Sequence, residues 1–402
     1  MASRAKIIVH DYAGHPFEVQ LSREFARRGY DVWHLYASDT VTPHGSMEPR
    51  PNDVPGFFSQ AIPMNPGYRI HKYNFLKRNS FEREYAKRLL DTCRRLKPNV
   101  IVSANTPTLI QSALIRYARK DGVRFINWVQ DFYSVAVGKL LRKKIGWIGS
   151  IIGGVFNWVE RRTLNHSDHI IYITDAFKEI AACWGVDPKK GTVIENWAPL
   201  DELPQKPKMN AWSRERQLDR NFVFLYSGTL GMKHNPDLLL RLALDHKDDP
   251  LVKVVVISEG LGIDWLREQA KSHGGLPNLE LLAYQPFESL PDVLASADVL
   301  IAILEKEAGV FSVPSKVLTY LCAGRPLLLA VPAANLASKI VSCSGAGEVC
   351  EPNDPEAFLN AARKLRVDGN LRETMAIAAR KYAVENFDIQ MIADRFEKVL
   401  GL

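Results

Sequence analysis

Short apolar runs and longer amphipathic stretches alternate along nearly the whole chain. Runs such as 6–10, 99–103 and 123–128 are apolar enough to be strands of a parallel sheet that is covered on both faces. Between these runs, apolar residues recur three and four positions apart, as they do on the buried stripe of a helix. The alternation predicts an α/β protein with parallel sheets.

The same alternation starts again in the second half of the chain. Strands are expected at 222–226, 252–258, 279–282, 299–304 and 327–331. The preceding segment, 199–220, is rich in Pro and charge and is interpreted as a linker. We therefore expect an N-terminal Rossmann-like domain over 1–200, a C-terminal Rossmann-like domain over 201–386, and a helix within 387–402 that packs back on the first domain.

Two segments do not follow this pattern. Residues 39–78 contain many Pro and Gly residues and no clear period, so we expect a binding loop or a mobile lid. Residues 145–159 are uncharged but too few to span a membrane, which takes about 20 apolar residues. Within 140–162 two interpretations stay open: a buried core helix, or an interfacial helix with basic flanks that contacts a membrane peripherally. The second interpretation is favoured.

Loops with glycine or polar side chains follow several of the predicted strands. Parallel strands present their C-terminal ends at one edge of the sheet, where ligands bind. A glycine turn with a lysine, Gly228 to Lys233, and the helix N-terminus at 313–316 suit a diphosphate. The carboxylates of Glu305 and Glu307 suit sugar hydroxyls instead. Together these features indicate a nucleotide-sugar site, although an ordinary strand-to-helix loop remains the alternative.

In the first half, candidate chemistry lies in two loops. Gly14 lets the backbone approach a ligand closely, and His15 stands at the start of the helix that follows. Asp131 follows the strand that ends at 129, again at a C-terminal strand end. Each also has an ordinary structural interpretation: an exposed or structural histidine, and an aspartate that turns the chain.

Composition limits the function classes. The chain has 402 residues, 46% hydrophobic residues and a formal net charge of +7, which is typical of a globular protein with a modest basic excess. No nucleic-acid motif accompanies the basic clusters, so no nucleic-acid partner is expected. Five scattered cysteines and the lack of a signal-like N-terminal segment predict a cytoplasmic protein. The segment 140–162 favours a peripheral position on the cytoplasmic membrane face.

Four stretches resemble one family. SGTLGMK (227–233), YQPFESLPDVLASADVLI (284–301), EAGVFSVPSKVLTYLCAGRP (307–326) and DYAGHPFEVQLSREFARRGYDV (11–32) are similar to segments of family 4 glycosyltransferases of the GT-B fold. The resemblance implies two Rossmann-like domains that face each other across a cleft. It also implies retaining transfer from a nucleotide-sugar, expected to be UDP-linked, onto a glycan or polyprenol-diphosphate-linked acceptor in bacterial surface polysaccharide synthesis.

The positions of these loops at strand ends and the resemblance together indicate roles for individual residues. Catalytic roles fall to His15, Asp131 and Glu307. The donor diphosphate would be bound by Gly228, Lys233, Val313, Ser315 and Lys316. The donor sugar and nucleoside would be bound by Gly14, Glu259, Gly260, Tyr284, Gln285, Pro286, Gly309, Val310, Phe311, Ser312 and Thr319. Thr319 departs from the family, which usually carries a second Glu there to hold the donor ribose.

No metal and no cofactor are expected, because the chain has no Asp-x-Asp triplet and the nucleotide-sugar is a substrate. Two alternatives to a hexosyltransferase stay open. One is a GT-B-fold UDP-sugar epimerase, which would act without an acceptor. The other is a non-catalytic nucleotide-binding component of a polysaccharide assembly complex.

Overall fold

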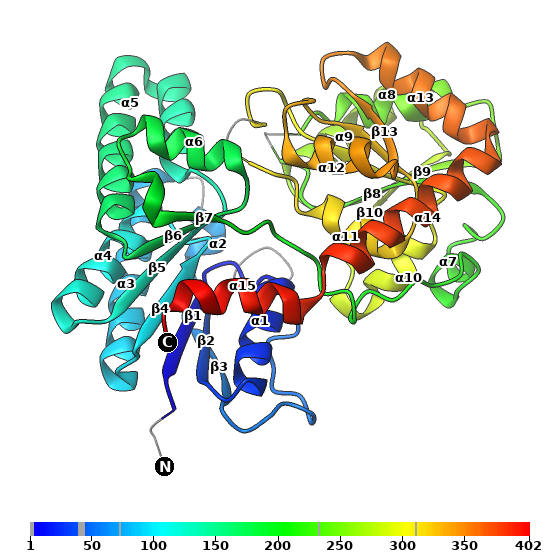
Figure 1. The fold of residues 1–402 in the computed structure, drawn as a ribbon. Coiled ribbons are helices and arrows are strands. Elements are labelled where there is room, and N and C mark those ends of the chain that lie inside the picture. Colours follow the sequence, from blue (N-terminus) through cyan, green and yellow to red (C-terminus); the bar gives the residue numbers. More distant parts are fainter. Residues whose placement is uncertain (1–3, 39–44, 72–73, 232–233, 310–311) are drawn as a thin grey trace. The chain divides into compact units, whose positions relative to one another are not determined.

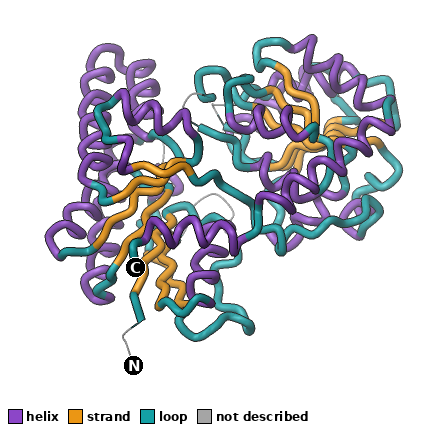
Figure 2. Tube along the Cα trace, in the orientation of Figure 1, coloured by secondary structure: helices purple, strands orange, loops and turns teal. Residues whose placement is uncertain are grey.

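The computed structural model describes residues 4–38, 45–71, 74–231, 234–309 and 312–402. They form two compact units: Met1–Asn196 together with Ile389–Leu402, and Trp197–Asp388. Each unit contains one β-sheet flanked by helices (Figures 1 and 2). Among the residues in these ranges, no helix combines the length and the apolar character that crossing a bilayer requires.

The sheet of the first unit has seven parallel strands in the order β3-β2-β1-β4-β5-β6-β7. The strands are β1 (Lys6–Asp11), β2 (Asp31–Ala37), β3 (Phe57–Ile62), β4 (Val100–Ala104), β5 (Arg124–Val129), β6 (His169–Tyr172) and β7 (Gly191–Val193). The central strands β1, β4 and β5 are buried over nearly their whole length, as their apolar sequences predict.

Helices cover both faces of this sheet. They are α1 (Pro16–Arg27), α2 (Tyr68–His71), α3 (Phe75–Leu96), α4 (Thr108–Asp121), α5 (Tyr133–His166), α6 (Asp175–Cys183) and α15 (Ile389–Leu400). In Figure 1, α3, α4 and α5 lie along one face, and α1 and α15 lie along the other. A short 3-10 turn, Pro188–Lys190, leads into β7.

The C-terminal helix α15 completes the core of the first unit. Its Phe396 ring lies 6.4 Å from the Phe25 ring and 4.8 Å from the Trp128 ring, measured between centroids. Arg28 donates to Asp394 and Glu397, each at 2.6 Å. The last helix therefore belongs to the first unit, although the chain reaches it through the second.

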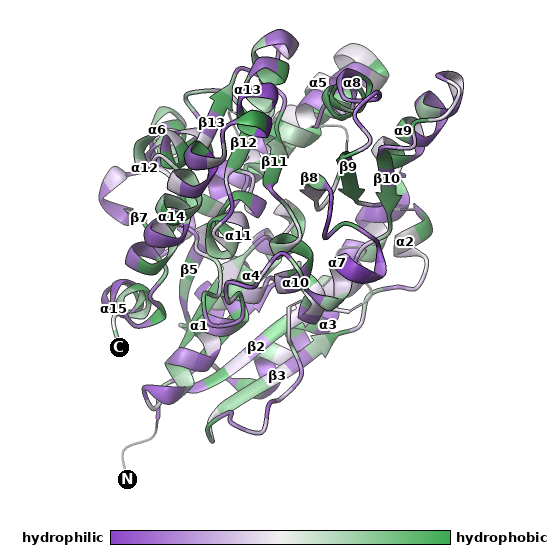
Figure 3. Ribbon diagram, turned by 90° about the vertical axis from the view of Figure 1, so that its right-hand side faces the viewer, coloured by the Kyte–Doolittle hydropathy of each residue, from purple (hydrophilic) through white to green (hydrophobic). Residues whose placement is uncertain are grey.

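The sheet of the second unit has six parallel strands in the order β10-β9-β8-β11-β12-β13. The strands are β8 (Phe222–Ser227), β9 (Val252–Ile257), β10 (Leu279–Leu282), β11 (Val299–Ile303), β12 (Leu327–Ala330) and β13 (Gly347–Cys350). Figure 3 shows β9 and β11 in the green of hydrophobic residues, in keeping with strands that are buried on both faces.

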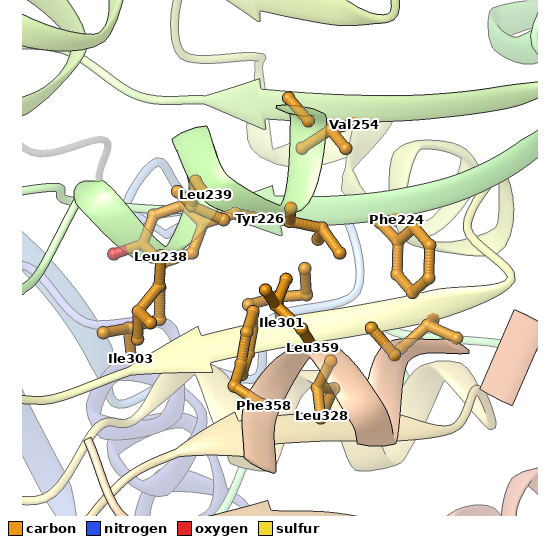
Figure 4. Packing of buried hydrophobic residues seen from close by; sticks show 14 of the residues in the cluster. Phe224, Tyr226, Leu238, Leu239, Val254, Ile301, Ile303, Leu328, Phe358 and Leu359 are labelled. Carbon is orange, nitrogen blue, oxygen red and sulfur yellow. The ribbon is translucent and has the colours of Figure 1, made fainter. Parts of the chain in front are cut away.

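The helices of the second unit are α7 (Ala211–Glu215), α8 (Asp237–Asp245), α9 (Leu261–Ser272), α10 (Leu290–Ala295), α11 (Lys316–Ala323), α12 (Leu336–Ser344), α13 (Pro355–Val367) and α14 (Gly369–Asn386). A 3-10 turn, Phe287–Ser289, precedes α10. Figure 4 shows how Leu238 and Leu239 of α8 and Phe358 of α13 pack with strand residues such as Ile301. This core fixes the strands whose ends carry the candidate site.

Two sequence-based expectations for irregular structure were wrong. The expected loop or lid at 39–78 contains the edge strand β3 and the helix α2. Only the end residues of β3, Phe57 and Ile62, are buried, so the strand lacks the continuous apolar run of its neighbours. The expected linker 199–220 contains α7, which begins at a capping box between Asn210 and Ser213. Asn210 also donates to the carbonyl of Asp292 at 2.9 Å, so this segment packs on the second unit.

Candidate functional site

Each sheet has one point where its strand order reverses. In the first unit the chain leaves β1 toward β2 but leaves β4 toward β5, so the reversal lies between β1 and β4. In the second unit it lies between β8 and β11. Loops on either side of such a point diverge and leave a crevice, which is where open α/β sheets bind ligands.

In the second unit, Lys316 lies beside the glycine turn that follows β8. Its Nζ lies 3.6 Å from the centre of the Tyr226 ring and 3.5 Å from the carbonyl oxygen of Thr229. Gly228 has a φ of +124°, and a Cβ built there would lie 3.3 Å from the Lys316 Nζ. Glycine is thus required twice, for the backbone conformation and for the space that the ammonium group occupies.

The N-terminus of α11 adds backbone donors to this cation. The first amides that bond within the turn are those of Val317, to the Pro314 carbonyl, and Leu318, to the Ser315 carbonyl. The N–H groups of the preceding residues, Ser315 and Lys316, lie where a helix has no intrahelical acceptor to offer. A lysine, a glycine turn and a helix N-terminus together form an arrangement suited to a phosphate group.

The loops after β9 and β10 reach the same glycine turn. The Tyr284 hydroxyl donates to Thr229 Oγ1 at 3.1 Å, and the Gly262 amide donates to the Leu230 carbonyl at 3.2 Å. Glu259, Gly260 and Pro286 are exposed on these loops, and Tyr284 and Gln285 are half-buried. Gln285 accepts from Trp212 Nε1 at 3.0 Å. The structure therefore brings the loops after four neighbouring strands to one edge of the sheet.

The acidic loop after β11 is held by a residue that the sequence analysis missed. Asn335, at the start of α12, donates to the carbonyls of Gly309 at 3.0 Å and Ser312 at 2.9 Å. Burial, followed by the nearby Glu307 charge, raises the pKa of Glu305, whereas Glu307 itself is exposed. An asparagine directly before a helix is a capping signal, and this one also fixes the loop.

The remaining predicted donor-site residues are placed as follows. Val313 and Thr319 are half-buried, Ser312 is buried and Ser315 is exposed. Lys233, Val310 and Phe311 lie outside the described residues.

In the first unit, Asp11 organises the loop that carries His15. Its carboxylate accepts from the backbone N–H groups of Ala13, at 3.0 Å, and of His15, and lies 3.4 Å from His15 Nδ1. Burial opposes ionisation of Asp11, but the His15 charge and hydrogen bonds lower its pKa below the ordinary value. Gly14, with a φ of +75°, makes this tight turn possible.

Glu18 and Asn105 stand next to this pair, and neither was predicted. Asn105 has a left-handed backbone, with φ +50°, and its Nδ2 donates to Glu18 Oε1 at 2.7 Å and lies 3.2 Å from His15 Nδ1. Glu18 is fully buried, and burial, followed by the Asp11 charge, raises its pKa well above the ordinary value. Glu18 shares a helical stripe with Leu21 and Phe25, and a carboxylate on an apolar stripe is the signal that identifies it.

Asp11, His15 and Glu18 also form a group whose ligand atoms lie within 4.8 Å of one another, among the residues given coordinates. N–H groups of Ala13, His15 and Asn105 already point at the two carboxylates. A cation would have to displace these donors, so the group is better suited to orienting His15 than to holding a metal.

Asp131 lines a small cavity of about 30 Å³ at the ends of β4 and β5. Asn105, Thr108 and Glu160 line it as well, and the buried Thr108 hydroxyl has no hydrogen-bond partner among the residues that the structure describes. Burial is the main cause that raises the pKa of Glu160 to about 7. Glu160 accepts from the Ser134 hydroxyl at 2.5 Å and its amide at 3.2 Å, at the first turn of α5. Asn105 therefore links this cavity to the His15 loop.

Helix α5 consists of two antiparallel helical arms. Its backbone departs from helical geometry at Ile145 and Gly146, and a Cβ on Gly153 would lie 2.6 Å from the Gly138 Cα on the other arm. The stripe that the sequence analysis identified is exposed: Trp147 by 73%, Ile151 by 58%, Val155 by 55% and Trp158 by 59%. These exposures argue against the interpretation of 145–159 as a core helix.

Two Rossmann-like parallel sheets, with a phosphate-type loop at the reversal point of the second, are the architecture of the GT-B class. Comparison with family models gives the family. Residues 19–202 match the model described as Glycosyltransferase Family 4, and residues 209–382 match Glycosyl transferases group 1. The chain belongs to this family of glycosyltransferases, as the four resembling stretches predicted.

Known relatives agree with this assignment. The chain is 24% identical, over 75% of its own length and 74% of the relative's, to the putative colanic acid biosynthesis glycosyl transferase WcaI of Escherichia coli. The crystal structure of Anabaena HepE in complex with UDP and glucose matches with a TM-score of 0.74 and 14% identity, over 99% of this chain and 100% of that one. WaaG, a glycosyltransferase involved in lipopolysaccharide biosynthesis, matches with a TM-score of 0.71 and 15% identity, over 98% and 99%. The two structures establish the fold.

Proposed function

We propose that this glycosyltransferase moves a hexosyl group from a UDP-sugar, with retention, onto a glycan or polyprenol-diphosphate-linked acceptor in bacterial surface polysaccharide synthesis. The observation that carries the proposal is the arrangement of Lys316, Gly228 and the α11 N-terminus at one reversal point. The polysaccharide context rests on the named roles of WcaI and WaaG, and the uridine nucleotide rests on the UDP complex of HepE.

In the proposed reaction the second unit binds the donor. Negative charge develops on the departing diphosphate as the bond between the sugar C1 and the phosphate oxygen breaks. Lys316 and the N–H groups of Ser315 and Lys316 stabilise this charge, because they are fixed before the reaction begins. Glu307 holds a sugar hydroxyl, and the neutral groups of Tyr284 and Gln285 border the nucleoside.

The first unit binds the acceptor in this proposal. An acceptor hydroxyl forms the new bond to C1 on the face that the diphosphate leaves, which preserves the configuration. Its proton passes to the departing phosphate oxygen. The proposed reaction uses no metal and no cofactor, because Lys316 and the backbone N–H groups neutralise the charge on the diphosphate. His15, oriented by Asp11, and Asp131 direct the acceptor hydroxyl.

A thermal-shift screen against UDP-, GDP- and dTDP-sugars tests the donor site. A ligand at 100 times its dissociation constant stabilises the folded protein by about 2.7 kcal/mol, so the true donor class stands out. Lys316→Ala should abolish that shift, whereas Lys271→Ala, an exposed lysine on α9, should retain it. An unchanged thermal shift in Lys316→Ala would show that Lys316 does not bind the diphosphate.

Product analysis with the donor alone separates transfer from its alternatives. An epimerase converts the donor sugar without an acceptor, and a non-catalytic component binds it without turnover. A transferase releases nucleoside diphosphate in proportion to glycosylated acceptor, and the anomeric configuration of that product tests retention. Addition of EDTA should leave this rate unchanged.

We also propose that the exposed face of α5 contacts the cytoplasmic membrane surface. Trp147 and Ile151 are exposed on one face, and the exposed basic residues Lys139, Arg142 and Lys143 lie on the adjacent arm. Apolar side chains that enter the headgroup region next to cations are typical of peripheral membrane helices.

Flotation with liposomes tests this contact. Trp147→Ala with Ile151→Ala should lower vesicle binding about tenfold or more, since each large side chain contributes about 1.5–3 kcal/mol when buried. The control is a double alanine variant at two exposed apolar residues of α14, Ile377 and Val384. Equal binding by both double variants would contradict the membrane contact.

A further inference from the structure

A cavity of about 610 Å³ lies between α3, α4 and α5 in the first unit. Five of its lining residues are basic: Arg83, Lys87, Arg94, Arg116 and Arg162. All five are exposed and come from three different helices. Glu82 is the one acidic residue among those that line it, and it is buried with Arg78 bound at 2.7 Å. The cavity therefore has a large excess of positive charge.

Beneath these cations the lining is apolar. Ala86 is buried, and Leu90, Leu109, Ala113 and Val159 are half-buried. Trp158 also lines the cavity, and the Arg162 guanidinium lies 5.4 Å from the centre of its ring. An apolar floor below a basic margin suits a ligand that has an anionic end and a hydrocarbon end.

The cavity is continuous with the exposed face of α5. Trp147, Ile151, Val155 and Trp158 follow one another at helical spacing, and the last of them lines the cavity. A lipid held there would have its hydrocarbon next to the same face that is proposed to enter the membrane.

We propose that this cavity binds the phosphate headgroup of a single anionic membrane lipid. The arginines bind the phosphate, because their planar guanidinium groups match its oxygens in pairs. The hydrocarbon next to the headgroup packs on Trp158 and Leu90. The volume falls within the range of small-molecule sites, about 300–1,000 Å³, and so fits one lipid headgroup. This proposal rests on the membrane contact proposed for α5, and it adds selectivity for anionic lipid.

Short-chain lipid tests the cavity without a bilayer. The probe is dihexanoyl phosphatidylglycerol below its micelle concentration, with the zwitterionic phosphatidylcholine of the same chain length as comparison. The full-length protein should bind the first and not the second. Arg83→Ala with Arg116→Ala should weaken binding about tenfold to thirtyfold, because the phosphate loses two charged hydrogen-bond donors. The control, Arg119→Ala with Lys120→Ala, removes the same charge from the end of α4 outside the cavity.

Each outcome decides between specific claims. Equal loss in both double variants would show attraction by net charge alone and overturn the cavity site. Equal binding of the two short-chain lipids would overturn it as well, as would displacement of the lipid by a short RNA at matched phosphate concentration. Loss of vesicle binding in Trp147→Ala/Ile151→Ala, with short-chain binding retained, would support both proposals. Vesicle binding without any short-chain binding would overturn the cavity and leave the α5 contact intact.

Discussion

The two sheets carry different side chains at the points where their strand order reverses. In the first unit these are two buried carboxyl groups and a histidine. In the second unit they are a lysine, a glycine turn and a helix N-terminus. The topology of the two sheets is alike at these points. Asp11 and Glu18 of the first unit accept hydrogen bonds from surrounding N–H groups, whereas Lys316 of the second donates. The same fold therefore places hydrogen-bond acceptors at the reversal point of one unit and a cation with backbone donors at that of the other.

The largest expected effect comes from Gly228→Ala, which tests the anion site. The new Cβ meets the Lys316 side chain, and alanine is strained at a φ of +124°. Loss of a pre-positioned cation should lower nucleoside diphosphate release on the order of 100-fold. Gly231→Ala is the control in the same loop, because among the described residues a Cβ there meets only Thr229, at 3.7 Å. If both variants kept full activity, Lys316 would not act on the donor.

A smaller effect is expected for Asp11→Asn, which tests the other unit. The amide NH2 cannot accept from a backbone N–H, so one of the bonds that fix the His15 loop is lost at a cost of about 1–3 kcal/mol. Transfer should fall about tenfold or more, while the thermal shift caused by the donor stays unchanged. Loss of donor binding in this variant as well would contradict the proposal that the two units bind donor and acceptor separately.

The smallest effect is expected for Glu18→Gln, measured as stability against pH. Glu18 keeps its proton in the folded protein to a higher pH than in the unfolded chain, because its pKa is raised. Wild-type stability should therefore fall as pH rises above the ordinary glutamate value, until Glu18 ionises in the folded state as well. Glutamine removes this slope. Urea unfolding at pH 5 and pH 8 measures the change in unfolding free energy between the two pH values. An equal change in the wild type and in Glu18→Gln would mean that Glu18 has an ordinary pKa.

The strands were the most predictable part of the fold. Runs such as Val299–Ile303 are apolar throughout because both faces of the strand are covered, and such a run can be recognised in the sequence itself. The edge strand β3 was not predictable in this way, since only its end residues are buried. The exposed stripe of α5 has the period of a core helix. Periodicity alone therefore does not show whether such a stripe faces solvent, lipid or another part of the protein.

The candidate site was partly predictable for a similar reason. Gly228 stands in the loop after β8 and Lys316 at the start of α11, two places that the strand order predicts to be close, and the structure places them in contact. Asn105, Glu160 and Asn335 were missed because their roles depend on partners 23 to 90 residues away. Such partners become neighbours only when the sheet assembles. Glu18 was detectable, since a charged residue there interrupts an apolar stripe.

The docking of α15 determines how the protein can be divided. Because Phe396 packs with Phe25 and Trp128, a recombinant fragment that stops at residue 196 would leave those two rings uncovered. A fragment that joins 196 directly to 389 would keep them covered. In terms of chain connectivity, the second unit is thus an insertion into the first.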